Sequence, residues 1–101
     1  MPEGFAETRF PPNRLLLWLK VRVKVLFFGM LRDIVGRSED EIELEEGSCL
    51  GCVFERYARQ YPRLSELKSS IVLARNHQFC DRSVIVGDGD EIAFLPPVSG
   101  G

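Results

Sequence analysis

Apolar and basic side chains alternate strictly along the segment that begins at Leu17. Six apolar residues point one way: Leu17, Leu19, Val21, Val23, Val25 and Phe27. Lys20, Arg22 and Lys24 point the other way. A period of two residues is typical of a β-strand with one buried face and one solvated face. We therefore predict a strand here, with its apolar face on a hydrophobic core.

A second alternating segment follows, after a short helical turn that we predict for "GMLRDIVGRS". In "EDEIELEEG", Ile42 and Leu44 point inward, and the outward residues are Glu41, Glu43 and Glu45. Opposite charges on neighbouring strands contribute about 0.2–1 kcal/mol each and cancel the local field. We interpret the basic residues of the first strand as part of a solvated, charge-paired face and not as phosphate ligands.

The segment "GSCLGCVFERYARQYP" predicts one main helix near residues 49–60. Ser48 is a suitable N-cap, and Pro62 is a suitable end. The apolar residues recur with helical spacing and form one stripe that can pack on a sheet: Leu50, Val53, Phe54, Tyr57, Ala58 and Tyr61.

The remaining segments complete an α+β pattern. Residues 63–69 predict a looser helical or turn region, and "IVLARN", "HQFC" and "DEIAFL" predict three more strands. "GDGD" is the turn before the last strand. The order of strand, strand, helix, strand, short strand and strand predicts a β-grasp (ubiquitin-like) domain, a mixed sheet with the helix packed across it. We expect the first and last strands to be adjacent and parallel.

The chain has 101 residues, which suits one domain with a single small core. We expect an N-terminal extension at residues 1–19, in part disordered, because "MPEGFAETRFPPNR" has three prolines and no apolar period. The β-grasp domain then covers residues 20–95, and a protruding C-terminal tail covers residues 96–101.

The charge and the cysteines exclude several classes of partner and location. A net charge of −2 gives no general attraction to nucleic acid or to an anionic membrane, so we expect neither as a partner. The apolar run from Leu15 to Leu19 is far too short to span a bilayer and lacks the features of a secretory signal. Three cysteines, an odd number, fit a reducing compartment. We expect a cytoplasmic protein.

Cys49 and Cys52 form a C-x-x-C at the predicted helix start, where the helix dipole lowers a thiol pKa. That pattern also occurs in redox pairs, and His77 and Cys80 would complete the ligand count of a structural zinc site. Cysteine is equally a common small buried residue. We favour packing or incidental thiols and predict no bound metal, with the zinc and redox alternatives left open.

One acidic cluster and one histidine are candidates for catalytic or binding residues, and we assign neither to a site. Asp88, Asp90 and Glu91 could form a carboxylate cluster, but "GDGDE" between strands is ordinary turn chemistry. His77 has no serine or cysteine partner at a recognisable spacing, so we assign no catalytic triad.

The last residues of the sequence are "FLPPVSGG", in which two conformationally restricted prolines precede two glycines without side chains. Pro96 and Pro97 cannot continue a sheet ladder and favour an extended helix, so we expect them to project the chain away from the domain. Gly100 and Gly101 have no Cβ and can enter a narrow channel with the terminal carboxylate sterically open. This order suits delivery of a reactive carboxylate into the active site of another protein.

The segments "VKVLFFGMLRDIVG", "RQYP" and "GDGDEIAFLPPVSGG" resemble the small subunit of molybdopterin synthase, over about residues 20–101. That family consists of β-grasp sulfur carriers. The resemblance implies that an activating enzyme adenylates the carboxylate of Gly101 with ATP and that the carboxylate then becomes a thiocarboxylate. It also implies that a large subunit, in a heterotetramer, carries the catalytic groups and builds the dithiolene of the molybdenum cofactor.

On this resemblance the chain donates sulfur without being catalytic by itself, and it binds no cofactor. Gly101 would hold the sulfur, and Gly100 would allow passage into the large subunit. We expect the outward residues Leu26, Phe28, Ala93 and Leu95 to form an apolar patch at the root of the tail. The residues predicted to contact the partner are Phe28, Leu95, Pro96, Pro97, Val98 and Ser99.

Two other functions fit the same residues. The chain could be a ubiquitin-like modifier joined through Gly101 to a lysine of a target protein. It could also be a β-grasp interaction module whose tail is chemically inert. Charging with sulfur would separate the inert module from the other two, and lysine-linked adducts would identify a modifier.

Overall fold

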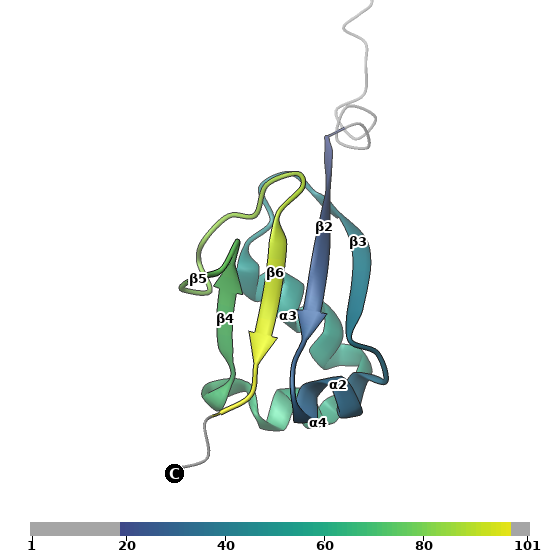
Figure 1. The fold of residues 1–101 in the computed structure, drawn as a ribbon. Helices are drawn as coiled ribbons and strands as arrows, with labels where there is room; N and C mark the ends of the chain where they lie inside the picture. Colours follow the sequence, from purple (N-terminus) through teal and green to yellow (C-terminus); the bar gives the residue numbers. More distant parts are fainter. Residues whose placement is uncertain (1–18, 98–101) are drawn as a thin grey trace, which may run out of the picture.

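The computed structural model describes residues 19–97 and forms a single mixed sheet with helices packed on it (Figure 1). In chain order the elements are β2 (Lys20–Phe27), α2 (Met30–Val35), β3 (Glu39–Glu45), α3 (Leu50–Gln60), α4 (Pro62–Glu66), the 3₁₀ helix η1 (Lys68–Ser70), β4 (Val72–Arg75), β5 (Gln78–Phe79) and β6 (Glu91–Leu95). The extension predicted for residues 1–19, except Leu19, lies outside the described residues. Between residues 19 and 97, no helix is long and apolar enough to cross a membrane.

The sheet has the strand order β3-β2-β6-β4-β5, which confirms the predicted β-grasp topology. β2 and β6 are parallel central neighbours, in a register that runs from Lys24 opposite Glu91 to Phe27 opposite Phe94. β3 pairs with β2, and β4 pairs with both β6 and β5, all antiparallel. The first and last strands therefore run side by side and end at the same edge of the domain (Figure 1).

The alternation along β2 has the predicted consequence on both faces. The inward side chains Val21, Val23, Val25 and Phe27 are buried. The prediction that Leu19 lies on the same buried face is wrong, because the pairing with β3 begins at Lys20 and Leu19 is 39% exposed. Leu17 lies outside the described residues. On the outward face, each basic residue of β2 lies directly opposite a glutamate of β3: Lys20 opposite Glu45, Arg22 opposite Glu43, and Lys24 opposite Glu41. The interpretation of these residues as a charge-paired, solvated face is confirmed.

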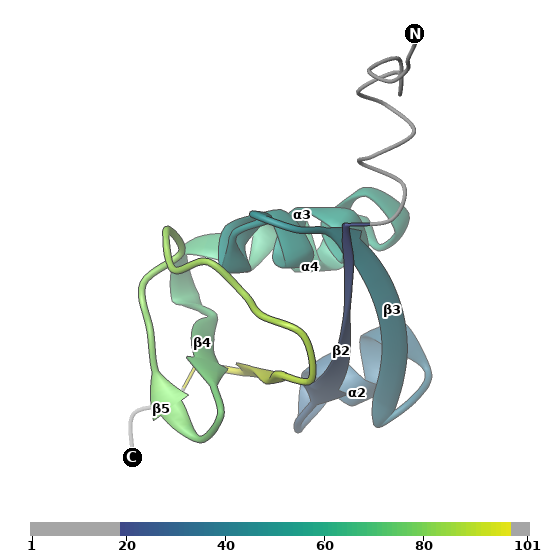
Figure 2. The same ribbon diagram turned by 90° about the horizontal axis from the view of Figure 1, so that it is seen from above.

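The core lies between the sheet and α3. Figure 2 shows α3 and α4 on one side of the strands. The predicted stripe of α3 is buried from Leu50 to Ala58, and Tyr61 packs against the core from its edge. Phe94 makes edge-to-face contacts with Phe27, Phe54 and Tyr57, at centroid distances of 5.6, 5.4 and 6.0 Å. Each such aromatic contact adds about 0.5–1.5 kcal/mol beyond the burial of apolar area.

The prediction that Ser48 caps the main helix is wrong, because Cys49 is the N-cap. Its Sγ accepts a hydrogen bond from the backbone N–H of Cys52 at 3.3 Å. The Ser48 hydroxyl instead donates to the carbonyl of Glu45 at 2.7 Å and closes the turn after β3. At the other end, α3 stops at Gln60 as predicted, and Pro62 begins the short helix α4 within the looser region.

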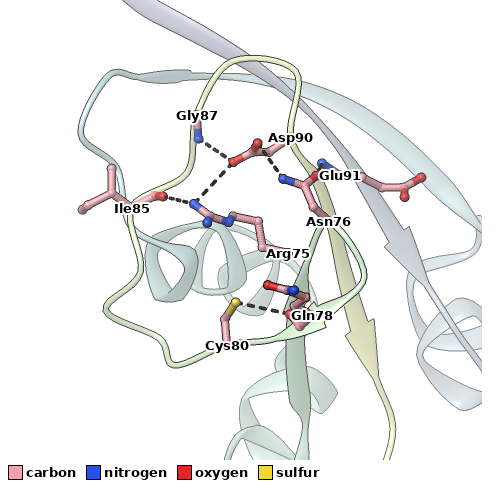
Figure 3. A network of polar contacts seen from close by, with 8 residues as sticks. All are labelled: Arg75, Asn76, Gln78, Cys80, Ile85, Gly87, Asp90 and Glu91. Atoms are coloured by element: carbon pink, nitrogen blue, oxygen red, sulfur yellow. Dashed lines mark hydrogen bonds and ion pairs between the residues drawn. The ribbon is translucent and has the colours of Figure 1, made fainter.

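The loop that leads into β6 is held by a network of polar contacts (Figure 3). The Asp90 carboxylate accepts hydrogen bonds from the Gly87 N–H at 2.7 Å and from Asn76 Nδ2 at 3.0 Å. Arg75 Nη1 donates to the Ile85 carbonyl at 2.9 Å. Because these groups satisfy loop and turn backbone, the interpretation of "GDGDE" as turn chemistry is confirmed.

Candidate functional site

The root of the tail is the point at which the chain leaves β6. Leu95 is the last residue of the strand and pairs with Val72 of β4. Pro96 and Pro97 follow outside the ladder, as predicted, because proline has no backbone N–H to donate. The partly buried Pro96 and the exposed Pro97 therefore carry the chain beyond the edge of the sheet (Figure 1). Val98, Ser99, Gly100 and Gly101 lie outside the described residues.

Gly29, in the loop between β2 and α2, lies beside this root. Its backbone has φ 56° and ψ −134°, a conformation that other residues rarely adopt. A Cβ added at Gly29 would lie 3.0 Å from Cγ of Pro96. The loop after β2 therefore lies close to the first proline of the tail, and a side chain at this position would crowd Pro96.

An apolar patch covers the outward face of the sheet beside the root. It consists of Leu26, Phe28, Ala74, Phe79, Ala93 and Leu95, around a shallow hollow of about 320 Å³. The register places Leu26 beside Ala93 and Ala93 beside Ala74. The predicted gathering of Leu26, Phe28, Ala93 and Leu95 on one face is thus confirmed, and binding of a partner there stays a prediction.

The patch is open to solvent, with Phe28 45% and Phe79 77% exposed. A contiguous exposed apolar patch of this kind often marks a surface that another molecule covers. An ion pair borders the patch, since His77 Nε2 and Glu91 Oε1 lie 2.6 Å apart. The sequence analysis missed Phe79 because β5 has two residues, too few to establish an alternating phase.

The four residues considered for zinc are divided between two parts of the fold. Cys49 and Cys52 lie together at the start of α3, with their Sγ atoms 2.9 Å apart. His77 pairs with Glu91, and the Cys80 thiol donates to the Gln78 carbonyl at 3.2 Å in the β4–β5 hairpin. In the stretch from residue 19 to 97, no three histidine, cysteine or acidic side chains are grouped to hold a metal ion.

The sheet order, the helix across it and the chain leaving β6 define a ubiquitin-like β-grasp domain. The chain belongs to the ThiS family, whose model matches residues 25–101. A molybdopterin synthase sulfur carrier subunit from Mycobacterium tuberculosis is 34% identical over 82 residues, covering 80% of this chain and 99% of the relative. The corresponding protein of Arabidopsis thaliana is 35% identical, covering 80% of this chain and 84% of the relative.

Solved structures agree with this assignment. A putative molybdopterin converting factor subunit 1 from Pyrococcus furiosus has a TM-score of 0.69 at 28% identity and covers 77% of this chain and 99% of its own. The small archaeal modifier protein 1 of Methanosarcina acetivorans also has a TM-score of 0.69 at 28% identity, with coverages of 81% and 98%. A complex of subunits 1 and 2 of molybdopterin-converting factor from Helicobacter pylori matches with a TM-score of 0.56 at 27% identity, with coverages of 80% and 100%.

Proposed function

We propose that this chain is the sulfur-carrier subunit of a molybdopterin synthase and that the carboxylate of Gly101 carries the sulfur as a thiocarboxylate. The observation that carries the proposal is the extent of the family match, which runs from residue 25 through Gly100 and Gly101. The diglycine is therefore part of the pattern that the chain shares with the ThiS family. The relatives named as sulfur carrier subunits of molybdopterin synthase support the particular pathway.

The chemistry requires activation because a carboxylate is a poor electrophile. In the proposed reaction, a carboxylate oxygen of Gly101 attacks the α-phosphate of ATP on an activating enzyme, and pyrophosphate leaves. Hydrosulfide supplied by the sulfur donor then attacks the acyl-adenylate carbon, AMP leaves with the oxygen, and loss of a proton gives the thiocarboxylate. Glycine favours both steps because it places no side chain beside the reacting carbon.

The proposed partner is the large subunit of the synthase, which would supply the catalytic groups. Support comes from the Helicobacter pylori structure, in which the similar chain is in complex with a second subunit. The apolar patch and the root of the tail lie next to each other on the domain. A partner seated on the patch would therefore receive the tail directly, with Phe28 and Leu95 in the contact and Pro96 and Pro97 directing the chain.

The activating enzyme uses ATP, and we propose that the carrier binds no cofactor of its own. Cys49, Cys52 and Cys80 are all free thiols. Free thiols fit a reducing compartment, so we propose the cytoplasm as the location.

Reconstituted sulfur transfer tests this function. The charged chain is mixed with the large subunit and the pathway precursor, and dithiolene formation is measured. We expect deletion of Gly101 to abolish product formation, because it shortens the tail, while the melting temperature stays at that of the wild type. A deletion variant that forms product at the wild-type rate would contradict the proposal.

Conjugation to proteins is the second candidate function. It is favoured by the similarity to the small archaeal modifier protein 1 of Methanosarcina acetivorans. A modifier forms an amide bond between Gly101 and a lysine, and tryptic digestion would leave residues 83–101 on that lysine, because Arg82 is the last basic residue of the chain. Lysine-linked adducts in cells that disappear on deletion of Gly101 would establish this second role. Their absence, combined with sulfur transfer in the reconstituted system, would leave the carrier role alone.

A further inference from the structure

The two cysteines at the start of α3 form a close thiol pair. Their Sγ atoms lie 2.9 Å apart, within hydrogen-bond distance for sulfur. Cys52 is exposed and Cys49 is partly exposed, so both can be reached from solvent. Cys49 occupies the N-cap position, and Cys52 lies one turn further along the helix. The sulfur-carrier function uses neither residue.

The two thiols are chemically unequal. The hydrogen bond from the Cys52 side chain lowers the pKa of Cys49, and the Cys52 backbone N–H adds to this effect. The same side-chain contact raises the pKa of Cys52. The thiolate is the form that attacks a disulfide. Cys49 is therefore suited to attack, and Cys52 is suited to complete the exchange.

The pair opens onto a basic groove of about 870 Å³. Its cationic side chains are Arg56, Arg59, Lys68 and Arg82, against the single carboxylate of Glu55. Lys68 Nζ lies 2.6 Å from Glu55 Oε2, so these two charges offset each other. The three arginines leave the groove with a positive field, which attracts anionic molecules.

Arg82 is one of the arginines that give the groove its positive charge. Its guanidinium lies 5.0 Å above the ring of Phe54, and Nη2 donates to the Lys68 carbonyl at 2.7 Å. Its Nη1 is buried and finds no hydrogen-bond acceptor among residues 19–97. The guanidinium therefore adds a fixed positive charge to the wall of the groove.

We propose that Cys49 and Cys52 form a dithiol–disulfide site that exchanges with small anionic disulfides of the glutathione type. The Cys49 thiolate attacks one sulfur of the disulfide, and the first small thiol leaves with a proton from solvent. The Cys52 thiolate then attacks Cys49 Sγ and expels the second small thiol. The protein loses two electrons and two protons, and one small disulfide becomes two thiols.

This site is separate from the tail in the fold. Cys49 forms an isolated β-bridge with Ile85, in the loop that leads to the start of β6. The tail leaves from the other end of β6, after Leu95. The two proposals can therefore be tested independently. A chain that fails to transfer sulfur from Gly101 could still form the disulfide, and a chain that forms no disulfide could still transfer sulfur.

Equilibration of the full chain in glutathione redox buffers tests the proposal. After an acid quench, free thiols are alkylated and the intact mass and the peptides are measured. We expect two thiols to be lost in one two-electron transition that maps to Cys49 and Cys52. Cys80 provides the internal control and stays alkylatable in the same samples. Cysteines 49 and 52 that stay reduced in the most oxidising buffer would overturn the proposal, as would loss of Cys80 at the same midpoint.

Single substitutions test the order of attack. Cys49→Ser keeps a residue that caps helices well, so the fold is retained. We expect Cys52→Ser to accumulate a mixed disulfide with glutathione at Cys49, several-fold faster than Cys49→Ser accumulates one at Cys52. Equal rates in the two variants would contradict the assigned roles, and a circular dichroism spectrum of each variant verifies its folding.

The charge of the groove predicts a preference among disulfides. Wild-type protein should react several-fold faster with anionic glutathione disulfide than with cationic cystamine at low salt. Arg59→Gln should reduce this preference, whereas the matched change Arg63→Gln, on α4 and outside the groove, should leave it unchanged. No preference in the wild type, or an equal loss in both variants, would overturn the role of the groove.

Discussion

The hydroxyl of Tyr57 connects the main helix to the edge strand β3. It donates to Asp40 Oδ2 at 2.9 Å, and Asp40 also pairs with Arg37 at 3.3 Å. Burial raises the pKa of Tyr57 above its ordinary value, and the hydrogen bond to Asp40 raises it further. The native state therefore holds the phenol proton at a pH where the unfolded chain loses it.

We expect Tyr57→Phe to lower the free energy of unfolding by about 0.5–1.5 kcal/mol at neutral pH, because it removes one partly buried hydrogen bond. Urea titration followed by circular dichroism measures the change. Tyr61→Phe is the control, since the Tyr61 hydroxyl makes no hydrogen bond within residues 19–97. The assigned contact would be wrong if both variants lost the same stability.

The raised pKa of Tyr57 also determines how the free energy of unfolding changes at alkaline pH. Above pH 10.0, the ordinary value for tyrosine, the unfolded state releases the proton that the native state retains. The contribution of this group is complete below that pH and is lost as the pH rises toward the native pKa. The stability difference between wild type and Tyr57→Phe should therefore shrink above pH 10.0, and a constant difference would contradict the account.

Gly29 offers a test of how the tail root is positioned. Gly29→Ala should cost about 1–3 kcal/mol, because its φ of 56° is strained for alanine and the new Cβ meets Pro96. Gly36→Ala is the matched control, since Gly36 also has a positive φ but has nothing within 4 Å of the added Cβ. Thermal melting measures both costs.

Gly29→Ala and Gly36→Ala also distinguish an effect on stability from an effect on the direction of the tail. We expect Gly29→Ala to slow sulfur transfer to the large subunit at a temperature where both variants are fully folded, because Pro96 must move. Gly36→Ala should transfer sulfur at the wild-type rate. Identical transfer rates for the two variants would show that the contact between Gly29 and Pro96 does not set the direction of the tail.

Among the elements, β2 and β3 form a ladder in which every outward basic residue faces an acidic one. Arg22 lies opposite Glu43, and its Nε is 4.0 Å from Glu41 on the diagonal. Exposed pairs of this kind are weak individually and are screened by salt. Their main effect is on register, because a shift of one residue would move Ile42 and Leu44 off the core face.

A double-mutant cycle on Arg22→Ala and Glu43→Ala measures this ladder. We expect a favourable coupling energy of about 0.2–1 kcal/mol at low salt that falls toward zero in about 1 M NaCl. The pair Arg22→Ala and Glu66→Ala is the control, because Glu66 lies on α4 away from the ladder. Coupling that is unchanged by salt would contradict an electrostatic origin.

Some helices and strands could be predicted from the sequence more completely than others. β2, β3 and α3 were predictable because each buries one face and so carries a clear period: two for β2 and β3, 3.6 for α3. The N-cap was not predictable, because Ser48 and Cys49 can both accept a backbone hydrogen bond and the turn after β3 decides between them. Phe79 escaped prediction because its position on the patch depends on pairing between Ala74 and Phe79, which is a contact between strands.

For the molecule as a whole, the apolar patch and the tail root lie on the same domain edge. The patch was predictable in part, since the phases of β2 and β6 place Leu26 and Ala93 outward once the strands are taken as neighbours. The basic groove beside Cys49 was not predictable. It combines Arg56 and Arg59 on α3 with Lys68 on η1 and Arg82 in the loop after β5, and no local pattern links these segments.

We expect Phe28→Asp to weaken binding to the large subunit about tenfold or more, because a buried interface would have to accept an unpaired carboxylate. The melting temperature should stay near that of the wild type, since Phe28 is 45% exposed. Ile85→Asp is the matched control, because Ile85 is 51% exposed and lies outside the patch. Calorimetric titration against the large subunit gives the affinities, and an unchanged affinity for Phe28→Asp would exclude the patch as the docking surface.

Intact-mass spectrometry after incubation with the activating enzyme, ATP and a sulfur donor tests the sulfur-carrier function most directly. The wild-type chain should gain the mass difference of one sulfur replacing one oxygen, and fragmentation should place that change at the carboxylate of Gly101. The chain without Gly101, treated identically, is the control for position and should not accumulate a productive thiocarboxylate. A wild-type chain that stays unmodified while a known sulfur carrier is charged in parallel, or that gains sulfur only on its cysteines, would contradict the account.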